Sequence, residues 1–458
     1  MRAPRDLPFV SPRRRLSGRL ALGLRRSGVP QLAALLSLGA AALTLRLRGS
    51  DEERERRFAI RLGRTLGRLR GPFAKLGQFA ALRVDGVAPE LRSALAELHE
   101  RVPPIPFDWI RAEIEAELRA PLGDLFREID PSPLGAASIA QVHAAILLDG
   151  RPVAVKVQYP WLARSLPLEL GLLRLALRIA AGRRVARAAW LDEFASGLAE
   201  ELDFEREAAV AHEIASNLAD ETQVVVPAVI ASHSSARVLT MERRPTLPLS
   251  GLAARGIPAR PVLETILRAY SRQIFDDGLF HADPHPGNLF VIDEPTAAHA
   301  PRVLFLDFGL SKRLAPELAR ELRQGILALL RRDLDAFVAG MVRIGAVAAG
   351  AEPAVRAAVA SVFAQLEAEP GGALALSGAR VLSLQEQAKR LLYETPGLSL
   401  PNDLLLYAKT LSYLFALGRE IAPEVDPMPL TLPFLLRFLA KREPAPTNAA
   451  AAVAPGAG

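Results

Sequence analysis

The sequence predicts a two-lobed α+β fold, in which a small mixed lobe precedes a larger and mainly helical lobe. Asp149 and Gly150 separate two short strand-like runs, and this dipeptide is a strong hairpin signal. After Pro245 the apolar pattern becomes helical almost to the end of the chain. Strands that come first and helices that follow favour separate layers over an alternating parallel sheet.

Length and composition allow a large core. The chain has 458 residues, enough for two or three packed units, and 50% of them are hydrophobic. It contains no cysteine, which excludes disulfides, thiolate nucleophiles and cysteine metal sites. Any metal must therefore bind oxygen or imidazole ligands.

The beginning of the chain is strongly basic. Residues 1–70 contain 17 Arg and no Lys against five acidic residues, whereas the whole chain carries only +7. An apolar run from Val29 to Leu45 follows the first arginine clusters. Such an arm can lie on an anionic membrane surface, and the alternative is a solvated leader followed by one core helix. No nucleic acid is expected as a partner, because the arm lacks interleaved aromatic residues and the remainder is acidic.

The segment after the arm has a helical apolar stripe, interrupted at Gly71 and Pro72. Lys75 and Gln78 lie about one turn apart on its flank. A second long helix is expected at about 188–218, with Asp203 and Glu207 on one face. Acidic residues on a helix usually form a solvated face.

A lysine lies inside the second strand of the predicted hairpin. Val153, Val155 and Val157 share one face of this strand, and Lys156 lies on the other. A lysine in a short apolar strand needs an anionic partner or a solvated cleft. Taken alone, Lys156 is better explained as an edge-strand residue that reaches water.

The stretch HADPHPGNLF, from His281 to Phe290, concentrates polar side chains after a helix expected to end near Gly278. One interpretation is a zinc site made by His281, Asp283 and His285. The other is a magnesium and phosphate site that combines Asp283 and Asn288 with Asp307, which follows a short buried strand at 303–306. Mg²⁺ prefers oxygen ligands and leaves coordination positions for phosphates.

The order of the motifs along the chain decides between the zinc and the magnesium interpretations. A lysine on a strand, a glutamate on the next long helix, a D-x-x-x-x-N loop and then D-F-G is the order of parts in protein kinases. Each motif alone is weak, but the ordered set is specific and favours magnesium. A phosphate-binding loop of the GxxxxGK[ST] type is absent from the sequence.

Over about residues 60–420 the sequence resembles the UbiB (AarF-type) family of atypical kinase-like proteins, which is associated with ubiquinone biosynthesis. The resemblance is carried by KLGQ, by the alanine-rich GAASIAQVH in place of a glycine-rich loop, and by VAVK, ELDFEREA, ADPHPGN and DFG. It implies a bilobal protein-kinase-like fold with an added K-x-G-Q helical extension.

The resemblance also implies residue roles. Lys156 would contact nucleotide phosphates and pair with Glu207, while Asp283 would be the catalytic-loop aspartate. The remaining assignments are the magnesium ligands Asn288 and Asp307, the ATP lid Ala136, Ala137 and Ser138, the adenine hinge around Met241 and Glu242, and the cleft-gating residues Lys75, Gln78, Glu201 and Asp203.

The implied cofactors are ATP and Mg²⁺, and the implied activity is ATP hydrolysis or small-molecule phosphorylation in ubiquinone or other isoprenoid-lipid metabolism. The alternatives are a kinase for protein substrates and a non-catalytic nucleotide-sensing scaffold. Expected partners are an anionic membrane surface or isoprenoid lipid and quinone-biosynthesis proteins. We expect a cytoplasmic protein that is peripheral at the inner membrane surface.

The sequence divides into five expected parts. They are a basic and apolar arm (1–57), the helical extension (58–119), the N-lobe (120–245), the helical C-lobe (246–442) and a disordered tail (443–458).

Overall fold

The structure, a computed structural model, describes residues 104–162, 189–293, 300–368 and 394–441, with residues 166, 167, 170, 171, 383, 387, 388 and 390–392 between them. The basic arm, the K-x-G-Q segment with Lys75 and Gln78, and the tail at 443–458 lie outside the described residues. Within the described part, no helix has the length and apolar character needed to cross a membrane.

A four-stranded antiparallel sheet in the order β1-β2-β3-β5 forms the small lobe. Its strands are β1 (Phe126–Ala136), β2 (Ala140–Leu147), β3 (Pro152–Gln158) and β5 (Val238–Glu242). The predicted hairpin at Asp149 and Gly150 is confirmed: it joins β2 to β3, and Gly150 has a φ of 90°. Since β3 is an interior strand, the edge-strand explanation of Lys156 is wrong.

Two helices, α6 (Phe107–Leu118) and α7 (Leu122–Leu125), complete the core of this lobe. Ile110 and Ile114 of α6 are fully buried together with the three valines of β3, as their alternation predicted. Residues 107–118 were expected within the helical extension, but their side chains pack on the sheet. They therefore belong to the same hydrophobic core as the N-lobe strands.

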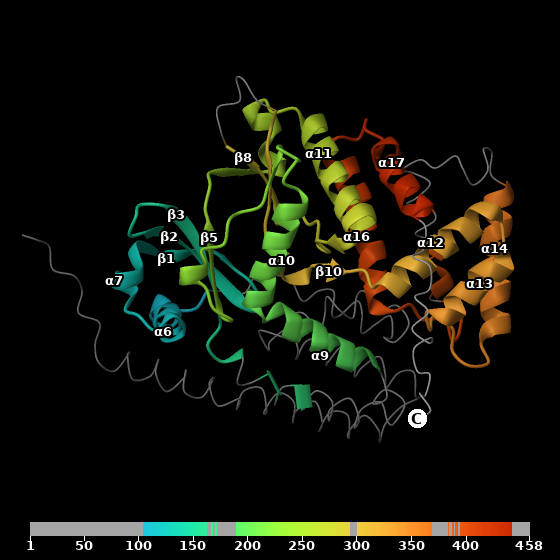
Figure 1. Cartoon of the computed structure of the whole chain (residues 1–458), viewed down its shortest axis with the longest axis horizontal. Coiled ribbons are helices and arrows are strands. Elements are labelled where there is room, and N and C mark those ends of the chain that lie inside the picture. The colour runs from blue at the N-terminus through green and yellow to red at the C-terminus, as the bar shows by residue number, and fades with distance from the viewer. Residues whose placement is uncertain are drawn as a thin grey trace, which may run out of the picture.

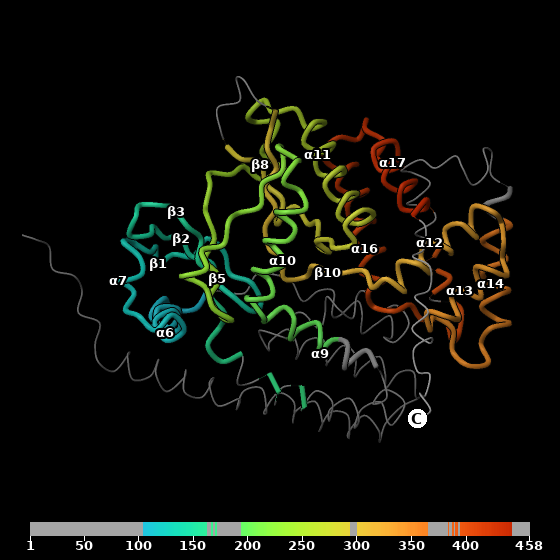
Figure 2. Tube along the Cα trace, in the orientation of Figure 1, coloured from blue at the N-terminus to red at the C-terminus, as the bar shows by residue number. Residues whose placement is uncertain are grey.

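The long helix expected at 188–218 is in fact two helices, α9 (Ala189–Glu201) and α10 (Phe204–Asn217). The first helix ends at Glu201, and Asp203 caps the second, because its carboxylate accepts a hydrogen bond from the Arg206 N–H at 3.0 Å. Asp203 and Glu207 therefore do not share a helical face. Figures 1 and 2 show α10 between the small sheet and the helical side of the molecule.

The larger lobe contains more strands than the sequence pattern indicated. A second sheet has the order β4-β9-β8-β6, and β7 pairs with β10. These short strands are β4 (Val224–Val225), β6 (Thr246–Pro248), β7 (Leu279–Phe280), β8 (Leu289–Ile292), β9 (Val303–Phe305) and β10 (Lys312–Arg313). The parallel pair β4 and β9 links the chain before β5 to the strand that delivers Asp307.

Helices make up the rest of this lobe. They are α11 (Ala259–Ser271), which continues as a π-helical turn (Arg272–Asp277) and ends at Gly278, then α12 (Pro316–Arg331), α13 (Leu334–Arg343), α14 (Glu352–Ala368), α16 (Asn402–Ile421) and α17 (Pro427–Ala440). In Figure 1, α12, α13 and α14 lie at the end of the molecule opposite the small sheet.

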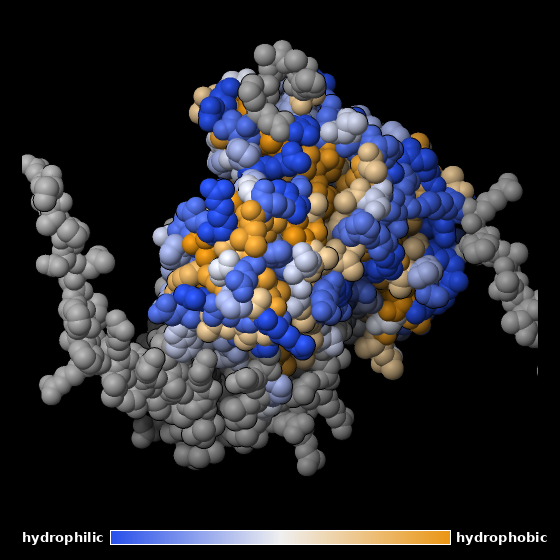
Figure 3. Space-filling model, turned by 60° about the vertical axis from the view of Figure 1, so that its left-hand side comes forward, coloured by the Kyte–Doolittle hydropathy of each residue, from blue (hydrophilic) through white to orange (hydrophobic). Residues whose placement is uncertain are grey.

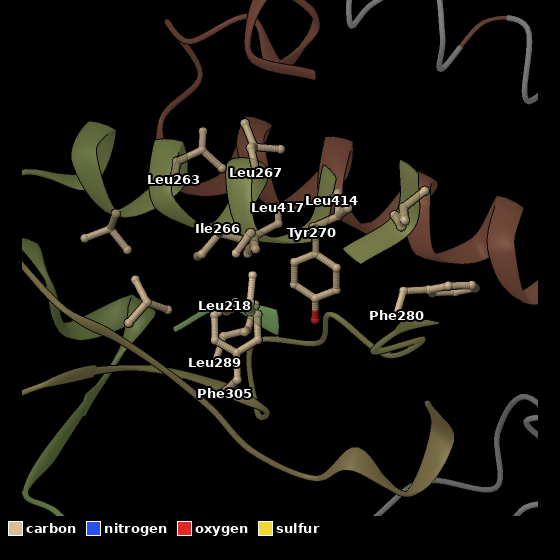
Figure 4. Packing of buried hydrophobic residues seen from close by; sticks show 14 of the residues in the cluster. Leu218, Leu263, Ile266, Leu267, Tyr270, Phe280, Leu289, Phe305, Leu414 and Leu417 are labelled. Atoms are coloured by element: carbon tan, nitrogen blue, oxygen red, sulfur yellow. The ribbon is translucent and has the colours of Figure 1, made fainter. Parts of the chain in front are cut away.

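The main core lies between α11, α16 and the second sheet. Figure 4 shows Ile266 and Tyr270 of α11 above Leu289 and Phe305 of the strands, with Leu414 nearby. All five side chains are buried. Figure 3 shows one face on which apolar residues gather centrally between polar margins. The core holds β8 and β9 against α11 and α16, and the loops at the ends of these strands carry the polar residues described next.

Candidate active site

Lys156 lies at the junction of three elements. Its ammonium is 2.8 and 2.9 Å from the two carboxylate oxygens of Glu207 on α10, and 3.0 Å from Asp307 Oδ1 after β9. The Phe204 ring centroid lies 5.0 Å away. The side chains of Lys156 and Glu207 are 13% and 1% exposed. Side chains from β3, from α10 and from the D-F-G turn are thus in contact, as the order of the motifs in the sequence predicted.

The electrostatics of this cluster keep the lysine charged. Burial alone would lower the pKa of the Lys156 ammonium, but the carboxylates of Asp307 and Glu207 outweigh it and hold the pKa above its ordinary value. The ammonium is therefore available as a fixed positive charge. In phosphoryl transfer, such a charge binds the phosphates of the nucleotide.

A third acidic side chain, that of Glu201, lies beside this cluster, next to Gly309. A methyl group added at this glycine would lie 3.4 Å from both Asp307 Oδ1 and Glu201 Cγ, and 3.5 Å from Glu207 Oε2. Glu201, which the resemblance placed among the cleft-gating residues, is therefore beside the D-F-G turn. Its partner in that assignment, Asp203, instead caps α10.

The segment after Asp307 is short and tightly held. Arg206 donates to the carbonyl oxygens of Gly309 and Ser311 at 3.3 and 3.0 Å, and the Lys312 ammonium is 2.6 Å from Glu200. Strand β10 pairs with β7 just before the polar loop. The D-F-G turn is consequently fixed to α9, α10 and the loop at 281–288.

His281 braces this loop. Its Nε2–H donates to the Leu306 carbonyl at 2.9 Å, and its Nδ1 accepts from the Tyr270 hydroxyl at 3.0 Å and from the Asp283 N–H at 3.3 Å. Both ring nitrogens are therefore engaged in hydrogen bonds within the core. This arrangement contradicts the zinc interpretation, because neither nitrogen of His281 has a lone pair left for a metal.

Asp283 projects from the loop between two donors. Asn288 Nδ2 donates to its Oδ2 at 3.2 Å and to its backbone oxygen at 3.1 Å. On the other side, the Lys409 ammonium of α16 lies 3.3 Å from Asp283 Oδ1. No motif in the sequence marks Lys409. The available signal was that it is the only charged residue between Asp403 and Arg419.

The predicted magnesium ligands suit a hard cation. Because Asn288 donates its amide hydrogens to Asp283, its side-chain oxygen is the atom left for a metal. Asp307 has a left-handed backbone with a φ of 61°, and its side chain is 51% exposed. One amide oxygen and one carboxylate are a typical protein contribution to a Mg²⁺ ion whose other ligands are phosphates and water.

The predicted lid is a tight turn between β1 and β2. The Ala137 N–H donates to the Ala140 carbonyl at 2.8 Å, and its own carbonyl accepts from the Tyr159 hydroxyl at 2.9 Å. Ala136 is the last residue of β1, and Ser138 follows in the turn. The backbone of Ala137 is thus bonded within the protein, whereas Ser138 lies at the tip.

The predicted hinge residues Met241 and Glu242 are the last two residues of β5. Met241 pairs in register with Ala154, and the Glu242 N–H donates to the Ala228 carbonyl at 2.9 Å. The N–H of Glu242 is therefore used by the protein itself. An adenine ring would have to find its donor in the chain beyond this strand.

Comparison with known families gives a match to the ABC1 atypical kinase-like domain over residues 97–341, more than half of the chain. The chain belongs to the ABC1 atypical kinase-like family. The predicted resemblance and the bilobal kinase-like fold are thereby confirmed, since residues 97–341 contain the small sheet, α10, the loop at 281–288 and the D-F-G turn.

Two curated relatives agree with this family. Two curated proteins named "Probable protein kinase UbiB" are each 32% identical to the chain. The one from Marinobacter nauticus aligns over 81% of this chain and 68% of its own length, and the one from Xylella fastidiosa over 86% and 71%. A solved structure of Rv3197 with erythromycin from Mycobacterium tuberculosis is 24% identical, with a TM-score of 0.48, and the match covers 78% of this chain and 93% of that one.

Proposed function

We propose that this member of the ABC1 atypical kinase-like family is a Mg²⁺-dependent, ATP-binding atypical kinase or ATPase. The observation that carries the proposal is the position of the Lys156 ammonium between Glu207 and Asp307, on an interior strand. A buried lysine with two carboxylates gives the charge pattern that a nucleotide phosphate and its cation need.

Each residue then has a role. Lys156 binds the nucleotide phosphates, Glu207 orients it, and Ser138 at the tip of the lid covers them. Asn288 and Asp307 hold Mg²⁺, which neutralises phosphate charge when it is bound. Asp283 orients the acceptor hydroxyl, or a water molecule, and accepts its proton.

A small-molecule acceptor is favoured over a protein substrate. Protein kinases carry a phosphorylatable loop between D-F-G and a later A-P-E motif. Here residues 310–315 alone separate the D-F-G turn from α12, and their single hydroxyl side chain, Ser311, is 1% exposed. Arg206 and Lys312 hold this segment against α9 and α10. This segment therefore presents no exposed hydroxyl of the kind that a phosphorylatable loop carries.

The names of the relatives support a proposal for the metabolic setting. Since two of them are named UbiB, we place this chain in ubiquinone or other isoprenoid-lipid metabolism. Its partners would be an isoprenoid lipid or an anionic membrane surface and quinone-biosynthesis proteins. We place it in the cytoplasm, peripheral at the inner membrane surface, with the basic arm as the contact.

The experiment is a titration of a fluorescent ATP analogue into the purified chain, with Mg²⁺ or with EDTA. The parent is expected to bind at least about tenfold more tightly with Mg²⁺, and Asp307→Asn is expected to lose this difference. Asparagine tolerates the left-handed backbone of position 307, so the fold should persist.

The matched control is Asp335→Asn, because Asp335 lies on α13 and pairs with Arg356 at the surface. It should keep the full magnesium dependence. Equal binding by the parent with and without Mg²⁺, or an unchanged magnesium effect in Asp307→Asn, would disprove the assignment.

A further inference from the structure

We propose that Lys409 is a further catalytic residue, the cation that contacts the transferred phosphoryl group on the acceptor side of Asp283. The inference rests on the proposed function and adds a residue from α16, more than one hundred positions after the catalytic loop.

The first support is the environment of the ammonium. Lys409 Nζ lies 3.3 Å from Asp283 Oδ1, and the two side chains are 17% and 25% exposed. A lysine this shielded from water, on a largely apolar helix, is costly unless an anion compensates its charge. Solvent screens such a pair less than it screens a surface ion pair.

The second support is the rigid mounting of α16 on the catalytic loop. The Thr410 hydroxyl oxygen is fully buried and lies 3.2 Å from the Ala282 carbonyl oxygen of the loop and 2.8 Å from the Leu406 carbonyl oxygen of its own helix. The Tyr407 ring packs edge-on against Phe280, with the centroids 5.8 Å apart. Residues on both sides of Lys409 are thus fixed to the residues before Asp283, so packing sets the position of the ammonium.

The third support is that Asp283 is already oriented without Lys409. Asn288 holds its side chain, and the His281 ring accepts its backbone N–H. A lysine at this point therefore adds charge to a loop that is already ordered. Of the three N–H donors of its ammonium, Asp283 accepts one, while the half-exposed Tyr413 ring lies 5.1 Å away.

The chemistry needs a cation at this point. In the transfer, the acceptor oxygen bonds to the γ-phosphorus, the bond from phosphorus to the bridging oxygen breaks, and that oxygen leaves with the electron pair on ADP. The acceptor proton passes to Asp283. Negative charge spreads over the equatorial phosphoryl oxygens, and fixed cations stabilise it. Lys156, beside Glu207 and Asp307, stabilises this charge on the side of the nucleotide. Lys409 stabilises it on the side of the acceptor oxygen and exchanges no proton.

The test exploits the absence of cysteine from the chain. Lys409→Cys introduces a single thiol, which 2-bromoethylamine converts into an aminoethyl thioether with an ammonium at the position of the lysine Nζ. Iodoacetamide adds a neutral group at the same thiol. Steady-state ATP turnover and ATP-analogue binding are measured before and after each reaction.

We expect kcat of Lys409→Cys to fall by about 100-fold, as for loss of one transition-state donor, while nucleotide affinity stays within about threefold of the parent. Aminoethylation should restore at least about a tenth of the parent kcat, and carbamidomethylation should restore none. Ala416→Cys, at an exposed position of the same helix, is the control and should respond to neither reagent.

Several results would overturn the proposed role of Lys409. If Lys409 only blocked Asp283, its removal would raise kcat, and this would overturn the proposal. Parent-like turnover in Lys409→Cys, or no recovery after aminoethylation, would also overturn it. Absence of turnover in the parent itself would instead reject the proposed function, and with it the role of Lys409.

Discussion

At the scale of single residues, the Lys156 cluster resolves an ambiguity that the sequence left open. Lysine on a strand is most simply a surface residue, and glutamate on a helix is most simply solvated. The structure buries both and brings them within 2.8 Å of each other. A buried charge that loses its partner is strongly destabilising, so each residue requires the other.

Glu207→Gln should therefore destabilise the fold. We expect the free energy of unfolding to fall by about 2 kcal/mol, because Lys156 keeps only Asp307 as an anionic partner. Glu213→Gln is the control, since Glu213 pairs with Arg313 at the surface and its loss should cost less than about 1 kcal/mol. Urea unfolding of both variants measures the difference, and equal losses would contradict the buried pair.

At the scale of secondary structure elements, a buried polar pair ties β2 to the chain that enters the small lobe. Gln141 accepts from the Ile105 N–H at 2.9 Å and donates to His143 Nε2 at 3.0 Å. His143 Nδ1–H donates to the Asp130 carbonyl at 2.7 Å. Both ring nitrogens are satisfied only while the imidazole is neutral. Protonation of Nε2 would place two donors against each other.

This pair predicts a pH dependence of stability. Burial lowers the pKa of His143 below its ordinary 6.5, against weaker opposing effects of the hydrogen bond to the Asp130 carbonyl and of the Asp130 charge. As the pH falls below 6.5, the unfolded chain takes up a proton that the folded chain resists, so stability should fall with pH. Urea unfolding between about pH 5 and 7.5 measures the slope.

His143→Gln should make that slope shallower. His212→Gln is the control, because His212 is exposed on α10 and should leave the slope unchanged. If His143→Gln kept the slope of the parent, the buried neutral histidine would not be its source.

The elements also show what local sequence can predict. Asp149 and Gly150 predicted the β2–β3 hairpin, because the residue preferences of a tight turn are local. The break between α9 and α10 was missed because apolar periodicity continues through Leu202, although Asp203 is a typical capping residue. The two-residue strands β7 and β10 carry no periodic signal, since pairing with a distant strand alone defines them.

At the scale of the whole molecule, the candidate site lies where the two lobes meet. β3 supplies Lys156 and α10 supplies Glu207. Asp283 lies in the loop between β7 and β8, and Asp307 follows β9. The order of the motifs along the chain predicted that Lys156, Glu207 and Asp307 lie together. Lys409 could not be predicted this way, because its contact with Asp283 depends on how α16 packs under the loop.

The most direct test of the central claim is ATP turnover by the purified chain with Mg²⁺ and with EDTA. Parallel reactions should add anionic vesicles, a generic protein substrate, or neither. We expect ADP release that requires Mg²⁺ and proceeds without a protein substrate, and Lys156→Met should abolish it. No ADP release in the presence of Mg²⁺, or release only when the added protein becomes phosphorylated, would contradict the account.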